Sequence, residues 1–250
     1  MPNSLVWMQN NSWAVLIVFS LLFLLLILKL FLLPRKTVPL RYIHSSIQLK
    51  GEQDRQSELF NIISTGSSLF AVIASGNWDT HYGRQIATMA VDVFKAAYQS
   101  GQYRIMPIED FYRQAADGVQ KAISDNVIEH NTPPSILAVI MENGFLHTAE
   151  IHGNMHGGTV YINGGGRLTK VARNRSFSKL QVMSIKIAED ETVMAASKGA
   201  ANSLTDMEIA LCLSQDIPIG RKCGKIEGII RRKRRSDQDN ATVIIVEQVP

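Results

Sequence analysis

Short apolar runs bounded by turn residues recur along the chain after position 68. The run at 136–141 is followed by Glu142, Asn143 and Gly144, and the apolar pattern returns at Phe145. Two apolar runs joined by such a turn are typical of a β-hairpin. The predicted strands span residues 69–74, 136–141, 145–151, 159–162, 168–172, 182–187, 192–196 and 242–246.

Two longer segments carry apolar residues at helical spacing. Apolar side chains recur every three or four positions over 86–97 and 111–123, and the acidic pair 109–110 favours a helix start before the second segment. Shorter helices are predicted over 205–213 and 220–230. Successive hairpins with helices inserted in blocks indicate an α+β domain, in which antiparallel sheet is covered by helices.

The first part of the chain has a different pattern. Residues 13–33 are apolar except for Ser20 and Lys29. At ~1.5 Å per residue, a helix of this length reaches ~31 Å, which is enough to cross a bilayer core. A signal peptide fits poorly, because no positive segment precedes the run, the run is too long, and no small-x-small cleavage site follows it. The sequence therefore predicts one retained transmembrane helix.

Charges around this helix predict its orientation. The first 28 residues contain no Asp, Glu, Lys or Arg, whereas Lys29, Arg35, Lys36 and Arg41 lie toward its C-terminal side. The positive-inside rule then places the N-terminus outside the cell membrane and the following domain in the cytoplasm. The predicted divisions are an extracytoplasmic N-terminus at 1–12, a transmembrane helix at 13–33, a juxtamembrane connector at 34–43 and one domain at 44–250.

The formal net charge of +4 is modest, and much of the excess comes from one basic run. In one interpretation the run binds anionic lipid headgroups or a phosphorylated partner. In the other it is the solvated C-terminal end of a helix, where cations are favourable. Because the run is isolated and has no interleaved aromatic residues, nucleic-acid binding is not expected. The run consists of Arg231, Arg232, Lys233, Arg234 and Arg235.

Four short motifs occur in a fixed order along the predicted domain. Residues 51–59 read GEQDRQSEL, residues 74–81 read ASGNWDTH, residues 197–200 read SKGA, and residues 239–243 read DNATV. Their order and spacing resemble the metal-dependent protein phosphatases of the protein phosphatase 2C type. The corresponding family motifs are G-x-x-R-x-x-N-E-D, A-D-G-x-G-G-H, S-D-G-L and D-N-x-T-V, and the last is the most specific match.

The resemblance covers about residues 48–246 and implies a sandwich of two antiparallel sheets flanked by helices. It also implies removal of phosphate from phosphoserine and phosphothreonine with two manganese or magnesium ions. In the family, the aspartates of these four motifs hold the metals. The matching positions here are Leu59, Ser75, Lys198 and Asp239, and Asn154 replaces the aspartate of a further family turn, G-D-S-R.

These replacements argue against metal chemistry. Two divalent cations ~3.5–4 Å apart need several carboxylates around them, and of the four family ligands only Asp239 survives. We expect the ammonium of Lys198 to take the vacant metal position and to pair with Asp239. No cofactor is therefore predicted, although manganese or magnesium is expected for the family. The family's arginines in the first motif and in G-D-S-R match Asp54 and His156.

Side chains near the former active-site turns are candidates for partner binding. An exposed Trp at such a turn would anchor a partner, and a packed Trp is the alternative interpretation. The predicted partner-binding residues are Trp78, Asp79, His81 and His156.

Carboxylates and histidines of the predicted domain suggest two further metal sites. One is an improvised site in which Glu58 and Asp239 join Asp79 and His81. The other is a zinc site formed by the histidines at 147, 152 and 156, whose spacing on a strand is too wide for one ion unless the turn at Gly153 folds them together. Surface or turn histidines are the simpler interpretation.

The sequence thus predicts a bacterial single-pass membrane protein with a cytoplasmic pseudophosphatase domain. This domain would act as a non-catalytic binding, scaffold or regulatory subunit of a membrane-associated complex with an unspecified protein partner. One alternative is a divergent metal-dependent Ser/Thr phosphatase with an altered metal site. Another is a structural subunit of a membrane machine such as a secretion or envelope apparatus.

Overall fold

The structure, a computed structural model, describes residues 12–32, 40–52, 56–76, 82–126, 133–153, 158–171, 180–233 and 238–249. The chain divides into an N-terminal unit, Met1–Pro39, and a second unit, Leu40–Pro250. Helix α2 (Ser12–Leu32) is the described part of the first unit and lies where the apolar run predicts a helix. Within the described residues, no helix has the length and apolar character needed to cross a membrane. The membrane anchor therefore stays a prediction from the sequence.

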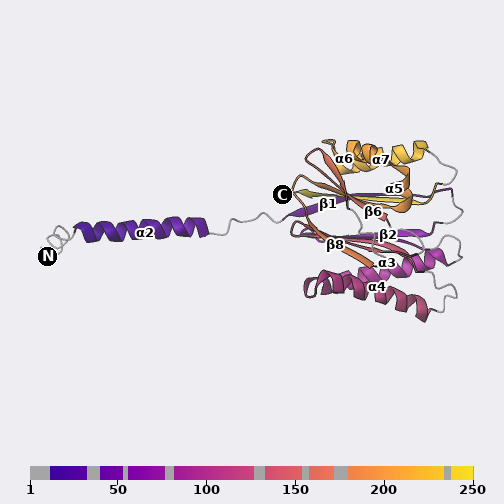
Figure 1. The fold of residues 1–250 in the computed structure, drawn as a ribbon, viewed down its shortest axis with the longest axis horizontal. Coiled ribbons are helices and arrows are strands. Elements are labelled where there is room, and N and C mark those ends of the chain that lie inside the picture. The colour runs from indigo at the N-terminus through magenta and orange to yellow at the C-terminus, as the bar shows by residue number, and fades with distance from the viewer. Residues whose placement is uncertain are drawn as a thin grey trace. The chain divides into compact units, whose positions relative to one another are not determined.

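The second unit contains two antiparallel five-stranded sheets (Figure 1). Sheet A has the strand order β1 (Arg41–Leu49), β10 (Ala241–Val249), β9 (Thr192–Ser197), β6 (Gly158–Gly164) and β7 (Arg167–Lys170). Sheet B has the order β2 (Glu58–Ser64), β3 (Ser68–Ser75), β4 (Ser135–Glu142), β5 (Phe145–Ile151) and β8 (Leu180–Lys186).

Helices cover the outer face of each sheet, as Figure 1 shows. Sheet B is covered by α3 (Gly83–Gln99) and α4 (Ile108–Asp125), which are connected through the short 3₁₀ helix η1 (Gln102–Arg104). Sheet A is covered by α5 (Lys198–Ser203), α6 (Asp206–Leu213) and α7 (Ile219–Lys233). The predicted α+β class, with a sandwich of two antiparallel sheets flanked by helices, is confirmed.

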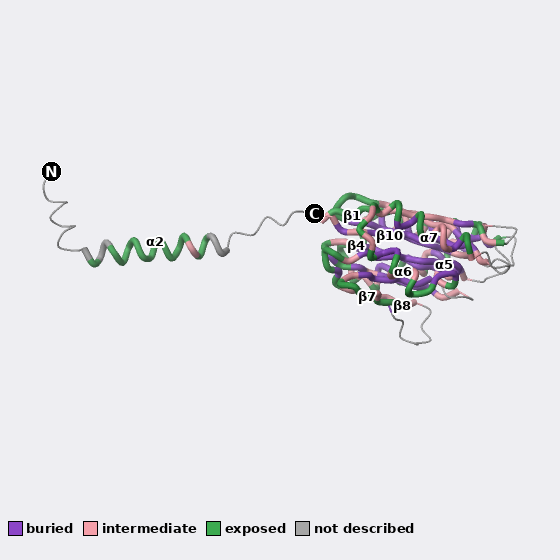
Figure 2. The backbone as a smooth tube through the Cα atoms, turned by 90° about the horizontal axis from the view of Figure 1, so that it is seen from above, coloured by how far each residue is buried: buried purple, intermediate pink, exposed green. Residues whose placement is uncertain are grey.

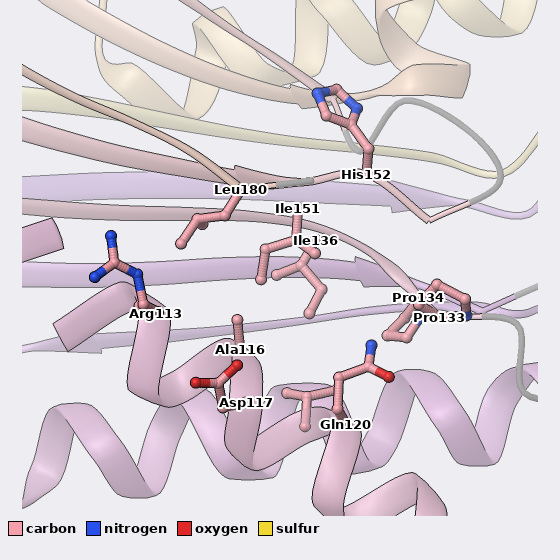
Figure 3. A pocket seen from close by; sticks show the side chains of 11 residues that line it. Arg113, Ala116, Asp117, Gln120, Pro133, Pro134, Ile136, Ile151, His152 and Leu180 are labelled. Atoms are coloured by element: carbon pink, nitrogen blue, oxygen red, sulfur yellow. The ribbon is translucent and has the colours of Figure 1, made fainter. Parts of the chain in front are cut away.

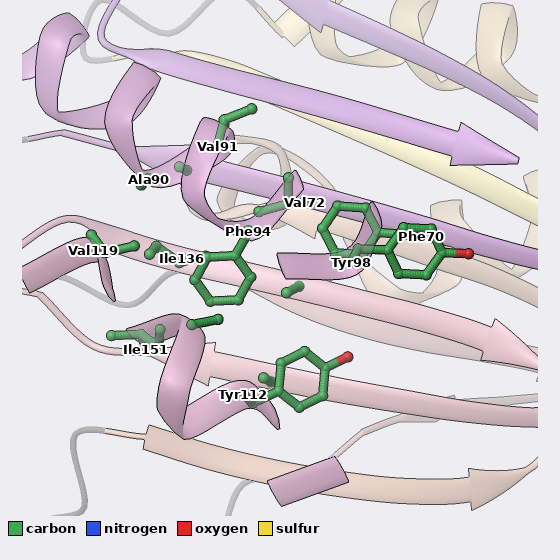
Figure 4. Packing of buried hydrophobic residues seen from close by; sticks show 14 of the residues in the cluster. Phe70, Val72, Ala90, Val91, Phe94, Tyr98, Tyr112, Val119, Ile136 and Ile151 are labelled. Carbon is green, nitrogen blue, oxygen red and sulfur yellow. The ribbon is translucent and has the colours of Figure 1, made fainter. Parts of the chain in front are cut away.

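Strand alternation builds three apolar layers from these elements. Successive side chains of a strand point to opposite faces of the sheet, so β3 sends Leu69 and Ile73 between the sheets and Phe70 and Val72 toward the helices. Figure 4 shows Phe70 beside Tyr98 of α3 and Val72 near Phe94 of the same helix in the helix-facing layer. A third layer joins sheet A to α5, α6 and α7. Figure 2 shows that burial follows the strands of the sandwich.

The structure differs from the sequence-based expectation at four elements. Strands β1 and β2, the short helix α5 and the 3₁₀ helix η1 are not predicted by the sequence. Strand β1 begins at Arg41, inside the range 34–43 that the sequence suggested as a connector. Both missed strands lie at sheet edges, and each shows a mixed pattern of exposed and half-buried positions rather than an apolar run.

Candidate functional site

Several strand ends meet at one edge of the sandwich. In sheet B, Glu58 at the start of β2 pairs with Ser75 at the end of β3, and Ser75 pairs with Ser135 at the start of β4. In sheet A, β9 ends at Ser197 and β10 begins at Ala241. The segments carrying the family-like motifs are therefore gathered at this edge by the pairing of the strands.

Two close backbone contacts hold these segments in place. A Cβ on Gly199 would lie 2.1 Å from the carbonyl oxygen of Asn240, so the start of α5 packs directly on the segment before β10. A Cβ on Gly76 would lie 1.8 Å from the carbonyl oxygen of Gly83, at the start of α3. Only glycine fits at either position, and both glycines occur where the family motifs have them.

Side-chain direction corrects one sequence-based assignment. Leu59 was expected at a former metal-binding position, but it packs against the helix-facing layer with Ala74 and Phe70. Because neighbouring residues of a strand face opposite ways, Glu58 points between the sheets, on the same face of β2 as Phe60 and Ile62. The carboxylate available at this edge from the first motif is thus that of Glu58.

Glu58 lies in a polar cluster that links the two sheets. Gln48 of β1 donates from Nε2 to the carbonyl oxygen of Glu58 at 3.0 Å and to Oγ1 of Thr242 at 3.3 Å. The backbone N–H of Thr242 donates to Oγ of Ser197 at 3.0 Å. The Glu58 side chain is enclosed, and its Oε1 has no hydrogen-bond partner among the residues that the structure describes. The sequence alone does not indicate that Gln48, Ser197 and Thr242 belong to one site.

Burial changes the acidity of Glu58. Desolvation raises the pKa of Glu58 to about 8, and the negative charge of nearby Asp239 adds to this rise. The hydroxyls of Thr242 and Ser197 favour the ionised form, but they do not outweigh the burial. Glu58 is therefore a neutral acid near pH 7, and a neutral carboxylic acid is a poor ligand for a divalent cation.

The three other family-matched positions lie on the segments gathered at this edge. Ser75 is half-buried, and its hydroxyl donates to the carbonyl oxygen of Gly76 at 3.4 Å. Lys198 is the half-buried first residue of α5. The Asp239 carboxylate accepts from the backbone N–H of Asn240 at 2.8 Å. This set contains a hydroxyl, an amine and one carboxyl group in addition to Glu58.

Several predicted site residues lie outside the described part of the chain. They include the whole partner-binding set, the residue at the G-D-S-R aspartate position and the end of the basic run. These residues are Trp78, Asp79, His81, Asn154, His156, Arg234 and Arg235.

The described residues do not fit a pair of divalent cations. No group of three or more His, Cys, Asp or Glu side chains among them is arranged to hold a metal. His147 and His152 engage separate partners, since His147 Nδ1 lies 2.8 Å from Ser184 Oγ and His152 Nδ1 lies 3.6 Å from Glu150 Oε1. No reaction step through bound manganese or magnesium follows from this arrangement.

The basic run is in part the end of a helix. Arg231, Arg232 and Lys233 form the last turn of α7. Arg231 pairs with Glu227 at 2.8 Å, and Lys233 pairs with Glu208 at 2.6 Å. Two cations of the run are therefore already neutralised within the domain.

A separate cavity of about 420 Å³ lies between α4 and the end of sheet B (Figure 3). Ile136, Ile151 and Leu180 supply apolar walls, while Arg113 and Asp117 lie on the α4 side. The cavity has the size of a small-molecule site. It adjoins the helix-facing layer, whereas the polar cluster of Glu58 lies between the sheets.

Comparison with solved structures identifies this architecture. The catalytic domain of the Ser/Thr protein phosphatase PstP, solved with two manganese ions, superposes with a TM-score of 0.66 at 13% identity, over 84% of this chain and 100% of that one. A Ser/Thr phosphatase of S. agalactiae gives a TM-score of 0.68 at 13% identity, covering 82% and 99% of the two chains. PppA of Pseudomonas aeruginosa, described as a key regulatory component of the T6SS, gives a TM-score of 0.63 at 14% identity, over 84% of this chain and 98% of that one.

The similarity is one of fold. No protein-family model and no curated protein sequence matches the chain. At these identities the solved structures establish that the domain has the fold of metal-dependent Ser/Thr phosphatases, and the site has to be interpreted from its own residues.

Replacing Glu58 with Gln tests the protonation of this carboxyl. The pKa of Glu58 in the folded protein, about 8, lies above the ordinary value of 4.5. The stability that the protonated carboxyl contributes is therefore fully present below pH 4.5 and is lost as the pH rises through about 8. Gln keeps the shape without titrating. The free energy of unfolding of E58Q relative to the wild type should therefore increase by up to ~1.4 kcal/mol per pH unit between these two values.

Urea unfolding of both proteins at several pH values across that window measures the difference. E189Q, which changes an exposed turn residue, is the matched control. A difference between E58Q and wild type that stays constant with pH would contradict a proton on Glu58.

Proposed function

We propose that the protein is a membrane-anchored pseudophosphatase, whose domain acts as a non-catalytic binding or regulatory subunit of a membrane-associated complex. The observation that supports this most directly is the chemical nature of the former metal site. The fold and the two glycines that hold the site resemble those of metal-dependent phosphatases. The side chains at the site are Ser75, Lys198, Asp239 and Glu58, whose pKa is raised.

Electrostatics makes this set unfavourable for two divalent ions. Like unit charges ~4 Å apart repel by ~4 kcal/mol at an effective dielectric constant of ~20, and a divalent ion doubles the effect. The ammonium of Lys198 would impose this cost on any cation placed beside Asp239. In this proposal Lys198 takes the place of the metal and balances the negative charge of Asp239.

The proposed contact surface is the edge that carried the active site. Its predicted anchors, Trp78, Asp79, His81 and His156, rest on the sequence. The proposed partner is a protein of a membrane-associated complex. A structural subunit of a membrane machine such as a secretion or envelope apparatus is a separate alternative. The similarity of fold to PppA, described as a key regulatory component of the T6SS, is compatible with a regulatory role.

The second candidate is a divergent metal-dependent phosphatase. One observation favours it: the charge of Asp239 acts on Glu58, so two carboxyl groups lie close together at the site. A metal that displaced the proton of Glu58 would have these two groups as ligands.

The anchor is proposed from the sequence of residues 13–33, with Lys29 as their only charged side chain. The exposure of the side chains of α2 is compatible with an apolar environment, since Phe19 and Phe23 are 67% and 65% exposed. The charge distribution puts the domain on the cytoplasmic side.

Manganese titration separates the two candidate functions. Isothermal titration calorimetry of the full chain is expected to show no binding of two ions, and phosphothreonine peptides should release no phosphate. The double variant S75D/K198D returns two carboxylates to the site and should gain at least ~10-fold in manganese affinity, or ~1.4 kcal/mol. S75N/K198N, similar in shape but uncharged, is the control. Tight binding of two ions with phosphate release by the wild type would establish the enzyme instead.

Replacing Lys198 with Met tests its role as a substitute cation. Loss of the ammonium leaves the charge of Asp239 uncompensated in a half-buried site, so the free energy of unfolding should fall by ~1 kcal/mol. Urea unfolding measures the loss, and K121M on the exposed face of α4 is the control. Equal stability of K198M and wild type would rule out this role.

Membrane fractionation tests the anchor. The full chain is expected in the carbonate-resistant membrane fraction, and deletion of residues 1–39 should release the domain. L22R/L25R should also release it, because each arginine near a helix centre costs ~2.5–3.5 kcal/mol, whereas L22A/L25A should stay bound. Recovery of the full-length wild type in the soluble fraction would overturn the anchor.

A further inference from the structure

The outward face of α7 carries a glycine at every fourth position. Gly220, Gly224 and Gly228 form this row, while Cys223 and Ile226 on the opposite face are buried against sheet A. Residues four apart lie on one side of a helix, one turn above another. The row therefore runs along the helix axis on the side turned away from the sandwich.

Nothing in the described fold requires glycine at these positions. A Cβ added to Gly220 or Gly224 would meet no atom within 4 Å, and one on Gly228 would meet only Nη1 of Arg232 at 3.9 Å. Glycine in a helix interior is destabilising relative to alanine. The glycines of α7 thus differ from Gly76 and Gly199, which are fixed by close backbone contacts inside the domain.

The row opens into a groove between α6 and α7 with a volume of about 810 Å³. Cys212 and Ile229 line it together with Leu211, which is 55% exposed. Met207, on the preceding turn of α6, is 73% exposed. Large apolar side chains are thus exposed on α6, beside the glycine row of α7.

The rim of the groove is basic. Arg221, Lys225 and Arg232 all line it. Within the described chain, Arg221 and Arg232 form no ion pair, and Lys225 bonds to the amide oxygen of Gln215. The carboxylate of Glu208, which also lines the groove, is already paired with Lys233. The rim therefore has two arginines whose charge is not neutralised by the domain.

We propose that this groove binds an amphipathic helix of a partner protein, with small and apolar side chains facing the glycine row and acidic side chains facing Arg221 and Arg232. A row without side chains lets a second helix backbone approach closely, and helix-in-groove recognition uses anchors at the same one-turn spacing. The unpaired arginines select negative charge on the partner. This surface covers the outside of sheet A, whereas the former metal site lies between the sheets.

A display selection against the full chain tests the proposal. The probe is a library of helical 20-residue peptides whose varied positions draw equally on Glu, Lys, Ala and Leu. Enriched peptides are expected to be acidic, with an Ala/Leu face at one-turn spacing. G224L fills the groove and R232E reverses its charge, and each should weaken binding of the selected peptides at least 10-fold in fluorescence anisotropy.

Two controls make the result specific. Q114L adds a leucine to an exposed position of α4 and should leave the affinity unchanged. G224A should melt at a higher temperature than the wild type, which shows that substitution at this position preserves the fold. Enrichment of basic or non-helical peptides, or equal binding by G224L and wild type, would overturn the proposal. Binding of phosphatidylserine vesicles by α7 without any selected peptide would overturn it in favour of a lipid surface.

Discussion

Face-to-face packing of the two sheets is the interaction on which the rest of this structure depends. The inner faces contribute an apolar layer that includes Leu69 and Ile73 from sheet B and Ile244 and Val246 from sheet A. Because strand side chains alternate, each sheet also has an outer apolar face that helices must cover. At one edge the inner layer gives way to Gln48 and the other polar residues around Glu58, so the position of the site follows from the packing of the core.

Burial between the sheets also determines the chemistry of the site around Glu58. Water is excluded from Glu58, and the carboxyl is held as a neutral acid without any change in the residue itself. A phosphatase of this fold needs the opposite condition, in which several ionised carboxylates surround two cations. In our proposal, the site keeps the shape of a phosphatase site but carries different charges. The edge of the sandwich that holds the site would then bind a partner and not catalyse a reaction. The groove between α6 and α7 would add a second contact surface, separate from the first.

Much of the fold was predictable because its central strands are apolar runs. Residues 69–74 and 136–141 are buried on both faces, and their composition alone identifies them as strands. The edge strands β1 and β2 were not predicted, because an edge strand is partly exposed and includes polar residues such as Asn61 and Gln48. Helix α5 was missed because six residues are too few to show a helical period.

The candidate site shows where sequence reasoning stops. Along the chain, the first motif aligns Leu59 with a metal ligand, and Glu58 enters only the alternative, improvised metal site. Only the pairing of β2 with β3 shows that Leu59 faces the helices and that Glu58 enters the site. A shift of one residue reverses the face of a strand, and no local pattern in this half-buried segment specifies which face is inward.

By itself, the sequence determined the class of fold, the order of most elements and the apolar N-terminal helix. Local composition and spacing of residues determine these properties. The tertiary structure decided which side chains share a site, since Gln48, Glu58, Ser197 and Thr242 come from four strands of two sheets. It also decided the protonation of Glu58 and the exposure of the glycine row on α7, because desolvation and accessibility depend on what the rest of the chain packs against each residue.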